Sequence, residues 1–247
     1  MKKILVIQSY RDMESAEGER RDYVRTLAEY TDLTFMSTLD TQLQWETPEA
    51  LLAGYHGVIF GGSSDFDFDG GRIESDPVLS DSKTILERMR PLVAHILQTE
   101  FPCMGICYGH QLIGLIQGGI VKNDKEQNKL GTFKVTLTDE GKADALFSML
   151  PVTFMAQYDH KDSLTEMPQG ATLLGTGERC YFSILRYGTA CYTIQFHVEF
   201  TENEMRAEYR SSSERFPVEV PLEQIIQPSP EASQILPLFV EKVCLND

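Results

Sequence analysis

The sequence lacks the features that mark membrane proteins and disulfide-stabilised secreted proteins. No stretch of the 247 residues approaches the roughly 20 consecutive apolar residues that a transmembrane helix needs. The apolar run in residues 1–8 is too short for a signal peptide and polar residues follow it at once, which favours a buried first strand. The five cysteines are odd in number and have no paired spacing, unlike a disulfide framework. We therefore expect a cytoplasmic protein whose thiols stay reduced.

Basic residues are also scarce, since 22 Lys and Arg stand against 37 Asp and Glu and the formal net charge is −15. Such a surface repels phosphate backbones and anionic lipid, so we expect neither nucleic acid nor a membrane as a partner. No H-x-x-x-H or C-x-x-C spacing suggests a zinc site, and there is no phosphate-binding G-x-x-x-x-G-K-[ST] loop. We interpret the acidic run Asp65, Asp67 and Asp69 as a solvated surface loop, and we expect no metal and no cofactor.

The N-terminal half alternates short apolar runs with amphipathic stretches. The apolar runs have the length of buried strands and cover residues 4–7, 33–36, 57–60 and 101–106. Helical periodicity covers residues 18–30 and 78–98, and Pro91 is expected to break or kink the second helix. Strands that alternate with helices predict βαβ units, and hence an α/β fold with a mainly parallel central sheet flanked by helices.

After about residue 118 the sequence becomes rich in strand-forming segments separated by turn residues. These segments are predicted to add antiparallel strands, and they cover residues 130–137, 152–157, 171–176, 180–186 and 189–196. No repeat or linker divides the chain, so we assign residues 1–247 to one domain, with 201–247 as a helical C-terminal extension. The sequence leaves open whether this extension packs on the domain or binds a partner.

The segment FPCMGICYGHQLIGLI carries the strongest chemical signal. Cys107 lies between Gly105 and Gly109 where a predicted strand meets a predicted helix, which is the G-x-nucleophile-x-G pattern. A side chain on that sharp turn projects above the carboxyl edge of the sheet, and the positive end of the helix stabilises a thiolate there. The alternative is a buried structural cysteine in a glycine-rich turn, and we assign that role to the other four cysteines.

A second motif, TIQFHVEF, lies ninety residues downstream. His197 and Glu199 close an apolar run, and residues i and i+2 of an extended chain face the same way. The carboxylate can therefore orient the imidazole while the imidazole exchanges a proton with the Cys107 sulfur. Two such motifs, each at the end of a predicted strand, predict a Cys-His-Glu catalytic triad.

With these motifs the sequence resembles the class I glutamine amidotransferase family. The family's G-x-C-x-G-x-Q turn is matched up to Gln111, and its H-P-E motif is matched by His197-Val198-Glu199. The segment YDHKDSLTEMPQG, with His160 and Asp162, is similar to the family's H-x-D loop. The match spans roughly residues 55–200 and is most similar to the amidotransferase half of guanylate (GMP) synthase and its free-standing relatives. It implies the flavodoxin-like three-layer fold of that family.

The resemblance also implies a role for each matching residue. Cys107 would be the nucleophile, His197 the general base and acid, and Glu199 the orienter of the ring. The main-chain N–H groups of Gly62 and Tyr108 would form the oxyanion hole. Substrate recognition would fall to Gln111 and His160. The sequence departs from the family at Val198, where proline is usual, and this change is expected to loosen the turn that holds Glu199.

The leading hypothesis is therefore a glutaminase that hydrolyses the side-chain amide of glutamine through a γ-glutamyl thioester. The ammonia would pass to an unidentified acceptor or to a separate synthetase subunit, because no synthetase region is expected in this chain. A second hypothesis is a γ-glutamyl hydrolase or peptidase that acts on another γ-glutamyl amine or peptide. A third is a non-catalytic binding module that uses the fold alone. The oligomeric state stays open.

Overall fold

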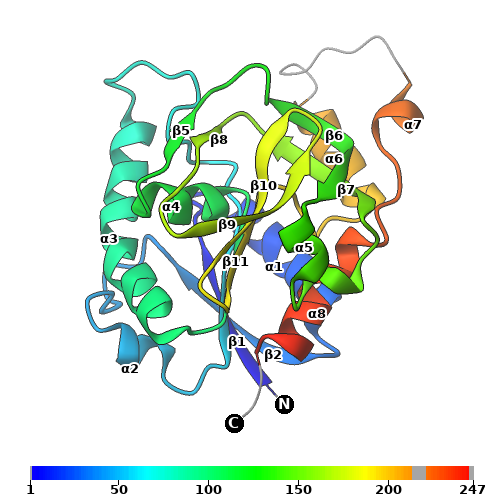
Figure 1. Ribbon diagram of the computed structural model, residues 1–247. Helices are drawn as coiled ribbons and strands as arrows, with labels where there is room; N and C mark the ends of the chain where they lie inside the picture. The colour runs from blue at the N-terminus through cyan, green and yellow to red at the C-terminus, as the bar shows by residue number, and fades with distance from the viewer. Residues whose placement is uncertain (1, 213–220, 245–247) are drawn as a thin grey trace.

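The protein is built around one large mixed sheet, and the computed structural model describes residues 2–212 and 221–244 (Figure 1). The strands are β1 (Lys2–Gln8), β2 (Thr31–Ser37), β3 (Gly57–Phe60), β4 (Cys103–Ile106), β5 (Ile120–Lys122), β6 (Lys129–Leu137), β7 (Thr153–His160), β8 (Ser163–Glu166), β9 (Ala171–Gly177), β10 (Cys180–Tyr187) and β11 (Cys191–Ile194). The helices are α1 (Met13–Leu27), α2 (Pro48–Leu52), α3 (Pro77–Thr99), α4 (Tyr108–Ile116), α5 (Asp139–Ala143), α6 (Glu202–Ser212), α7 (Leu222–Ile225) and α8 (Ile235–Lys242).

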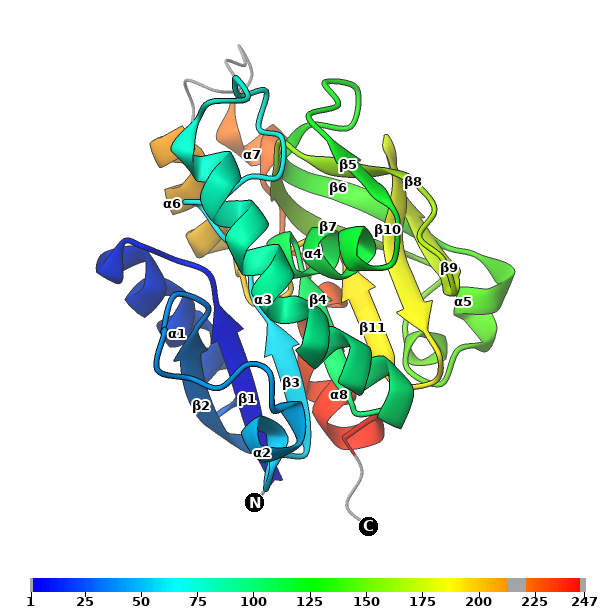
Figure 2. The same cartoon turned by 90° about the vertical axis from the view of Figure 1, so that its left-hand side faces the viewer.

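The first half of the sheet is parallel and places the candidate site. Its strand order is β2-β1-β3-β4-β11, and every neighbouring pair in it is parallel. All residues of β3, β4 and β11 are buried, as expected for apolar strands covered on both faces. These strands point the same way, so their carboxyl ends share one edge of the sheet (Figure 2). The predicted α/β fold with a mainly parallel central sheet is confirmed.

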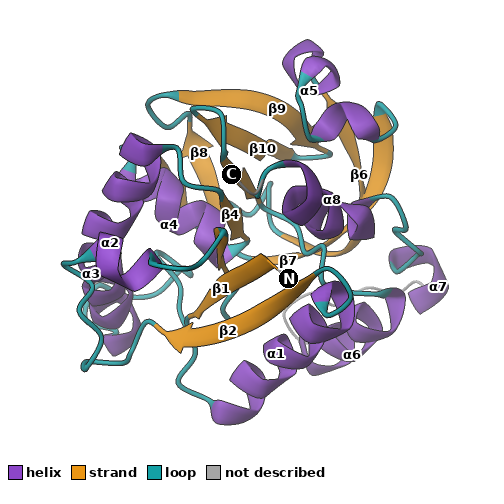
Figure 3. Cartoon of the chain, turned by 90° about the horizontal axis from the view of Figure 1, so that it is seen from below, coloured by secondary structure: helices purple, strands orange, loops and turns teal. Residues whose placement is uncertain are grey.

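Helices cover both faces of this parallel half (Figure 3). The alternation of side chains along β1 explains the two layers, because successive residues of a strand face opposite sides. Ile4 and Val6 belong to a core cluster shared with α1 and α8. Leu5 and Ile7 belong to a second cluster shared with α3 and α4. Each layer thus buries one apolar stripe of its helices against the same strands.

The second half of the sheet is antiparallel, as predicted, and continues from β11 in the order β10-β9-β6-β7. Four of the five predicted segments correspond to these strands. The fifth, 189–196, corresponds to the shorter β11, which pairs antiparallel with β10 but parallel with β4. Two short strands were missed. These are β5 and β8, which form a separate antiparallel pair.

Two helical predictions need correction. Helix α3 continues through Pro91 without a break, with buried residues on both sides of it, such as Met89 and Leu92. Packing on the sheet therefore outweighs the hydrogen bond that Pro91 cannot donate. Helix α1 begins at Met13, well before the predicted 18–30, because the Asp12 side chain accepts a hydrogen bond from the N–H of Ser15 and caps the helix there. None of the described helices combines the length and apolar character needed to cross a membrane.

The described chain after Thr201 contains helices α6, α7 and α8, with residues 226–231 outside any helix. Residues 213–220 and 245–247 of the predicted extension lie outside the described residues. Helix α8 contributes Ile235, Leu236 and Phe239 to the core cluster on the α1 face. It therefore closes one layer of the domain. The assignment of residues 1–247 to one domain with an extension stays a prediction.

Helix α4 begins in close contact with the end of β3 because it carries glycine there. A methyl group on Gly109 would lie 2.3 Å from the carbonyl oxygen of Phe60, and one on Gly105 would lie 2.9 Å from the carbonyl oxygen of Gly109. Main-chain atoms cannot rotate away as a side chain can. The two glycines that flank Cys107 are thus required by packing.

Gly109→Ala is expected to lower the free energy of unfolding by about 1–3 kcal/mol, since the added methyl overpacks the join of β3 and α4. Thermal or urea denaturation measures this change. Gly18→Ala on α1 is the matched control, because the nearest atom to its added methyl is Arg21 Nη2 at 3.8 Å. That change should be neutral or stabilise by up to about 1 kcal/mol. Equal effects of the two substitutions would contradict the packing argument.

Candidate active site

Cys107 occupies the turn between β4 and α4 in a backbone conformation that is rare for a residue with a side chain. Its φ is 50° and its ψ −101°, a strain that costs about 1–3 kcal/mol. The main-chain N–H of Cys107 donates to the carbonyl oxygen of Ile194 at 2.9 Å and so continues the pairing of β4 with β11. Helix α4 starts at the next residue, so its unpaired N–H groups and positive end lie beside the sulfur.

His197 reaches the same place from the segment that follows β11. The predicted strand 189–196 is wrong at its end, because the chain leaves β11 early and the N–H of His197 donates to the carbonyl oxygen of Gln157 at 2.8 Å. The ring and the thiol nevertheless flank the same glycine. A methyl group on Gly62 would lie 3.1 Å from His197 Cε1 and 3.9 Å from Cys107 Cβ.

The imidazole of His197 is held by a buried carboxylate. Its Nδ1 lies 2.6 Å from Glu199 Oε1, and the rings of His197 and Phe200 stack with centroids 4.3 Å apart. Burial disfavours a charged ring, yet the pKa of His197 is raised well above its usual value. The causes are the charge of Glu199 and the charge and hydrogen bond of Cys107. The site therefore favours an imidazolium beside the sulfur.

Val198 strengthens the hold on Glu199, contrary to the expectation of a looser turn. Its main-chain N–H donates to Glu199 Oε2 at 2.9 Å, while Oε1 accepts from His197. A proline at this position could not donate that bond. Both carboxylate oxygens of Glu199 are thus bound, and the acid is only 2 % exposed.

Amide groups also lie close to the Cys107 thiol. Gln195 Nε2 lies 3.7 Å from Sγ, and the Asp159 carbonyl oxygen lies 3.6 Å from it. Gln111 Nε2 donates to the Asp162 carbonyl oxygen at 2.7 Å and to Gln195 Oε1 at 3.2 Å. The amide of Gln111 is therefore engaged within the protein, although the residue lines the cavity. Sequence reasoning missed Gln195, and its only signal is a polar residue inside the apolar run TIQF.

The two groups expected to form the oxyanion hole differ in their partners. Tyr108 is the first residue of α4, so its N–H has no acceptor within the helix. The N–H of Gly62 donates to Glu19 Oε1 at 2.9 Å. Glu19 is a buried residue of α1 that sequence reasoning missed, because no local pattern shows that it meets the turn after β3.

His160 lines the cavity as a neutral ring. Burial lowers its pKa to about 3. Its Nδ1 lies 3.1 Å from the Asp162 carbonyl oxygen and 3.1 Å from Ser163 Oγ. Its Nε2 has no hydrogen-bond partner among the described residues.

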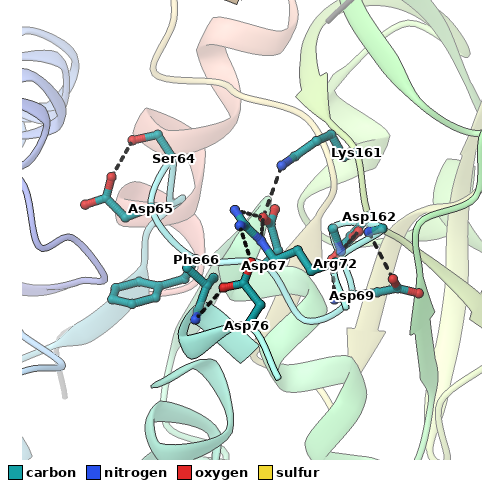
Figure 4. A network of polar contacts seen from close by, with 12 residues as sticks. Ser64, Asp65, Phe66, Asp67, Asp69, Arg72, Asp76, Lys161 and Asp162 are labelled. Atoms are coloured by element: carbon teal, nitrogen blue, oxygen red, sulfur yellow. Dashed lines mark hydrogen bonds and ion pairs between the residues drawn. The ribbon is translucent and has the colours of Figure 1, made fainter. Parts of the chain in front are cut away.

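The loop after β3 is anchored by polar contacts and is not the solvated loop expected from its acidic run (Figure 4). The Asp162 carboxylate accepts hydrogen bonds from three successive main-chain N–H groups, those of Phe68, Asp69 and Gly70, at 2.7–3.0 Å. Asp67 forms ion pairs with Arg72 at 2.7 Å and with Lys161 at 3.1 Å. Asp162 thus fixes this loop as one wall of the site.

A cavity of about 470 Å³ opens beside Cys107 and His197, a size typical of small-molecule sites. Helices α1 and α6, the anchored loop and the end of β7 line it. Acidic side chains outnumber Lys and Arg in the lining by nine to two. Within the described residues, no group of three or more His, Cys, Asp or Glu side chains could hold a metal ion.

The protein is thus an α/β protein that presents a thiol, an imidazole and a carboxylate at the carboxyl edge of its parallel strands. The sequence profile described as "Glutamine amidotransferase class-I" matches residues 69–213, more than half of the chain. The chain therefore belongs to the class I glutamine amidotransferase family and is an enzyme of this type. The matched range contains Cys107, His197 and Glu199.

Individual relatives agree with this family. The chain is 36% identical over 109 residues to a glutamine-hydrolysing GMP synthase of Borreliella burgdorferi, covering 44% of this chain but only 21% of that protein. It is 27% identical over 175 residues to a subunit of the glutamine-hydrolysing GMP synthase of Sulfurisphaera tokodaii, covering 70% of this chain and 82% of that one. A glutamine amidotransferase structure from Thermotoga maritima shares the fold, with a TM-score of 0.72, 18% identity and 99% coverage of both chains.

Glu199→Gln is expected to slow alkylation of Cys107 by iodoacetamide near neutral pH by about tenfold or more. Without the carboxylate, burial would lower the pKa of His197, and each unit of pKa is worth about a factor of ten. The imidazolium would then be lost at lower pH, and with it the cationic partner of the thiolate. Glu202→Gln is the control, since this half-buried acid pairs with Arg206. An unchanged rate in Glu199→Gln would contradict the charge coupling.

Val198→Pro is expected to reduce the same alkylation rate, because Glu199 Oε2 loses a hydrogen bond worth about 1 kcal/mol. Val198→Ala keeps the N–H and is the matched control. It should lose some stability, because Val198 is buried, but it should keep the reactivity of the thiol. Equal reactivity of the two variants would show that the N–H of Val198 does not position Glu199.

Proposed function

We propose that this protein hydrolyses the side-chain amide of glutamine through a triad of Cys107, His197 and Glu199. One observation carries the proposal. The strained Cys107 and the imidazole of His197 flank the same glycine, and Glu199 binds the far side of the ring. A nucleophile, a base within reach and a group that orients the base are the parts of covalent amide hydrolysis.

The reaction would proceed in two steps. The thiolate of Cys107 attacks the amide carbon, and the N–H groups of Tyr108 and Gly62 are the proposed donors to the negative charge on the oxygen. His197 gives a proton to the leaving nitrogen, the C–N bond breaks, and ammonia departs from a γ-glutamyl thioester. Water, deprotonated by His197, then attacks the thioester and releases glutamate and the thiolate. Glu199 stabilises the imidazolium in both steps.

The ammonia is proposed to serve a synthetase subunit or another acceptor. The support is that one relative, from Sulfurisphaera tokodaii, is named as one subunit of a glutamine-hydrolysing GMP synthase. A reduced thiol is required for the attack, so the reducing cytoplasm is the proposed location.

Hydrolysis of another γ-glutamyl amide is a second candidate, and the extent of the cavity favours it. The lining continues from the triad along α1 and α6 to Glu14 and Glu208, so there is room for a substituent on the amide nitrogen. The acidic lining suits a substituent that carries a positive charge. Comparison of kcat/KM for glutamine, a γ-glutamyl diamine and a γ-glutamyl peptide separates the two candidates.

Cys107→Ala is expected to abolish ammonia release from glutamine, lowering kcat by at least about a thousandfold, as for other nucleophiles of covalent catalysis. A coupled glutamate assay measures the rate. Cys180→Ala is the matched control, because this cysteine is buried in β10 and burial raises the pKa of its thiol to about 11. It should keep the activity. Turnover that persists in Cys107→Ala would refute the proposed function.

A further inference from the structure

A buried carboxyl in the cavity wall has no part in the reaction proposed above. Glu19 lines the cavity with Cys107 and is only 5 % exposed. Its Oε1 accepts from the N–H of Gly62 at 2.9 Å, and its Oε2 accepts from Gln8 Nε2 at 2.8 Å. Gln8 is fixed in turn, because its Oε1 accepts from Arg20 Nε at 2.9 Å. The carboxyl is therefore held from both sides in one orientation.

The Gly61-Gly62 turn is shaped around this carboxyl and the catalytic ring. A methyl group on Gly61 would lie 2.2 Å from Glu19 Oε1, and one on Gly62 would lie 3.1 Å from His197 Cε1. The first glycine thus leaves room for the carboxyl and the second leaves room for the imidazole. The peptide between them lies where α1 and the catalytic residues meet.

One N–H group cannot donate hydrogen bonds of full strength to two acceptors at once. An oxyanion hole needs its donors 2.7–3.1 Å from the reacting oxygen, and Glu19 already binds the N–H of Gly62 at such a distance. We propose that Glu19 competes with the reacting carbonyl oxygen for the Gly62 N–H and thereby limits the rate of attack by Cys107. Glu19 acts through Gly62, so it is a positioning residue. This inference rests on the proposed function.

The charge of Glu19 sets the strength of this competition. Burial, as the largest cause, raises its pKa to about 8, with a further contribution from the charge of Glu199, while hydrogen bonds from Gln8 and Gly62 and the charge of His197 act in the opposite direction. Among the described residues, Tyr10 from the loop after β1 and Tyr23 from α1 also interact electrostatically with Glu19. Below a pH of about 8 the carboxyl is mostly neutral, and above it the carboxylate binds the N–H more strongly and repels the developing oxyanion.

The test compares kcat for glutamine in Glu19→Gln and in the wild type across pH. The amide keeps an acceptor for Gly62 but cannot ionise. The ratio of kcat in the variant to kcat in the wild type should be constant below about pH 7 and rise at least about threefold by about pH 9, with KM unchanged. The ratio rises because ionised Glu19 in the wild type binds the Gly62 N–H more strongly and so slows the attack. The Gly62 amide resonance should shift with an apparent pKa near 8 in the wild type and show no such shift in the variant.

Two further variants complete the experiment. Glu19→Ala removes the acceptor and should raise kcat above that of the wild type near pH 8 by about threefold to tenfold. Glu87→Gln is the control, because it removes an acid with a 56% exposed side chain on α3, paired to Arg90 and outside the contacts of Glu19. It should leave the profile unchanged.

The outcomes separate this inference from the function on which it rests. A ratio of Glu19→Gln to wild type that stays flat across pH, together with a slower Glu19→Ala enzyme, would show a purely structural carboxyl and overturn the competition alone. A wild type that does not hydrolyse glutamine at any pH would overturn the proposed function and the inference with it.

Discussion

The parallel pairing of β4 with β11 is the constraint on which the candidate site depends. Its ladder brings residues almost ninety positions apart into register, with Gly105 opposite Thr193 and Ile106 opposite Ile194. The next hydrogen bond of the ladder, from the N–H of Cys107 to the carbonyl oxygen of Ile194, fixes the strained turn at Cys107. His197 follows β11 at the same edge. A shift of this register would separate the Cys107 thiol from the His197 imidazole.

Much of this arrangement could be predicted from the sequence, because it follows from local patterns. Short apolar runs predicted the buried strands β3 and β4, and the glycines around Cys107 predicted the sharp turn between a strand and a helix. The pair His197 and Glu199 was predicted from its spacing, and the two side chains do contact each other. The extended geometry assumed for that pair was wrong, since β11 ends before it. The contact between His197 and Glu199 forms nevertheless, because the N–H of Val198 donates to the second oxygen of Glu199.

The remaining features could not be predicted because they arise from contacts between distant segments. Strands β5 and β8 are three and four residues long, too short for an alternating pattern to show. Asp162 accepts hydrogen bonds from three main-chain N–H groups more than ninety residues earlier in the chain. Because of these bonds, the acidic loop is fixed as a wall of the site, although its sequence suggests a solvated loop. In the sequence, Glu19 does not differ from the other acidic residues of its amphipathic helix. Only the tertiary structure shows that it accepts a hydrogen bond from Gly62.

Of the five free cysteines, Cys107 alone is proposed to be activated by its position. The most direct measurement treats the protein with a glutamine analogue that carries a chloromethyl ketone in place of the amide, followed by peptide mass spectrometry. We expect a single adduct on Cys107, saturable labelling kinetics and protection by free glutamine. Labelling spread evenly over Cys107, Cys180 and Cys244, or no protection by glutamine, would contradict this activation.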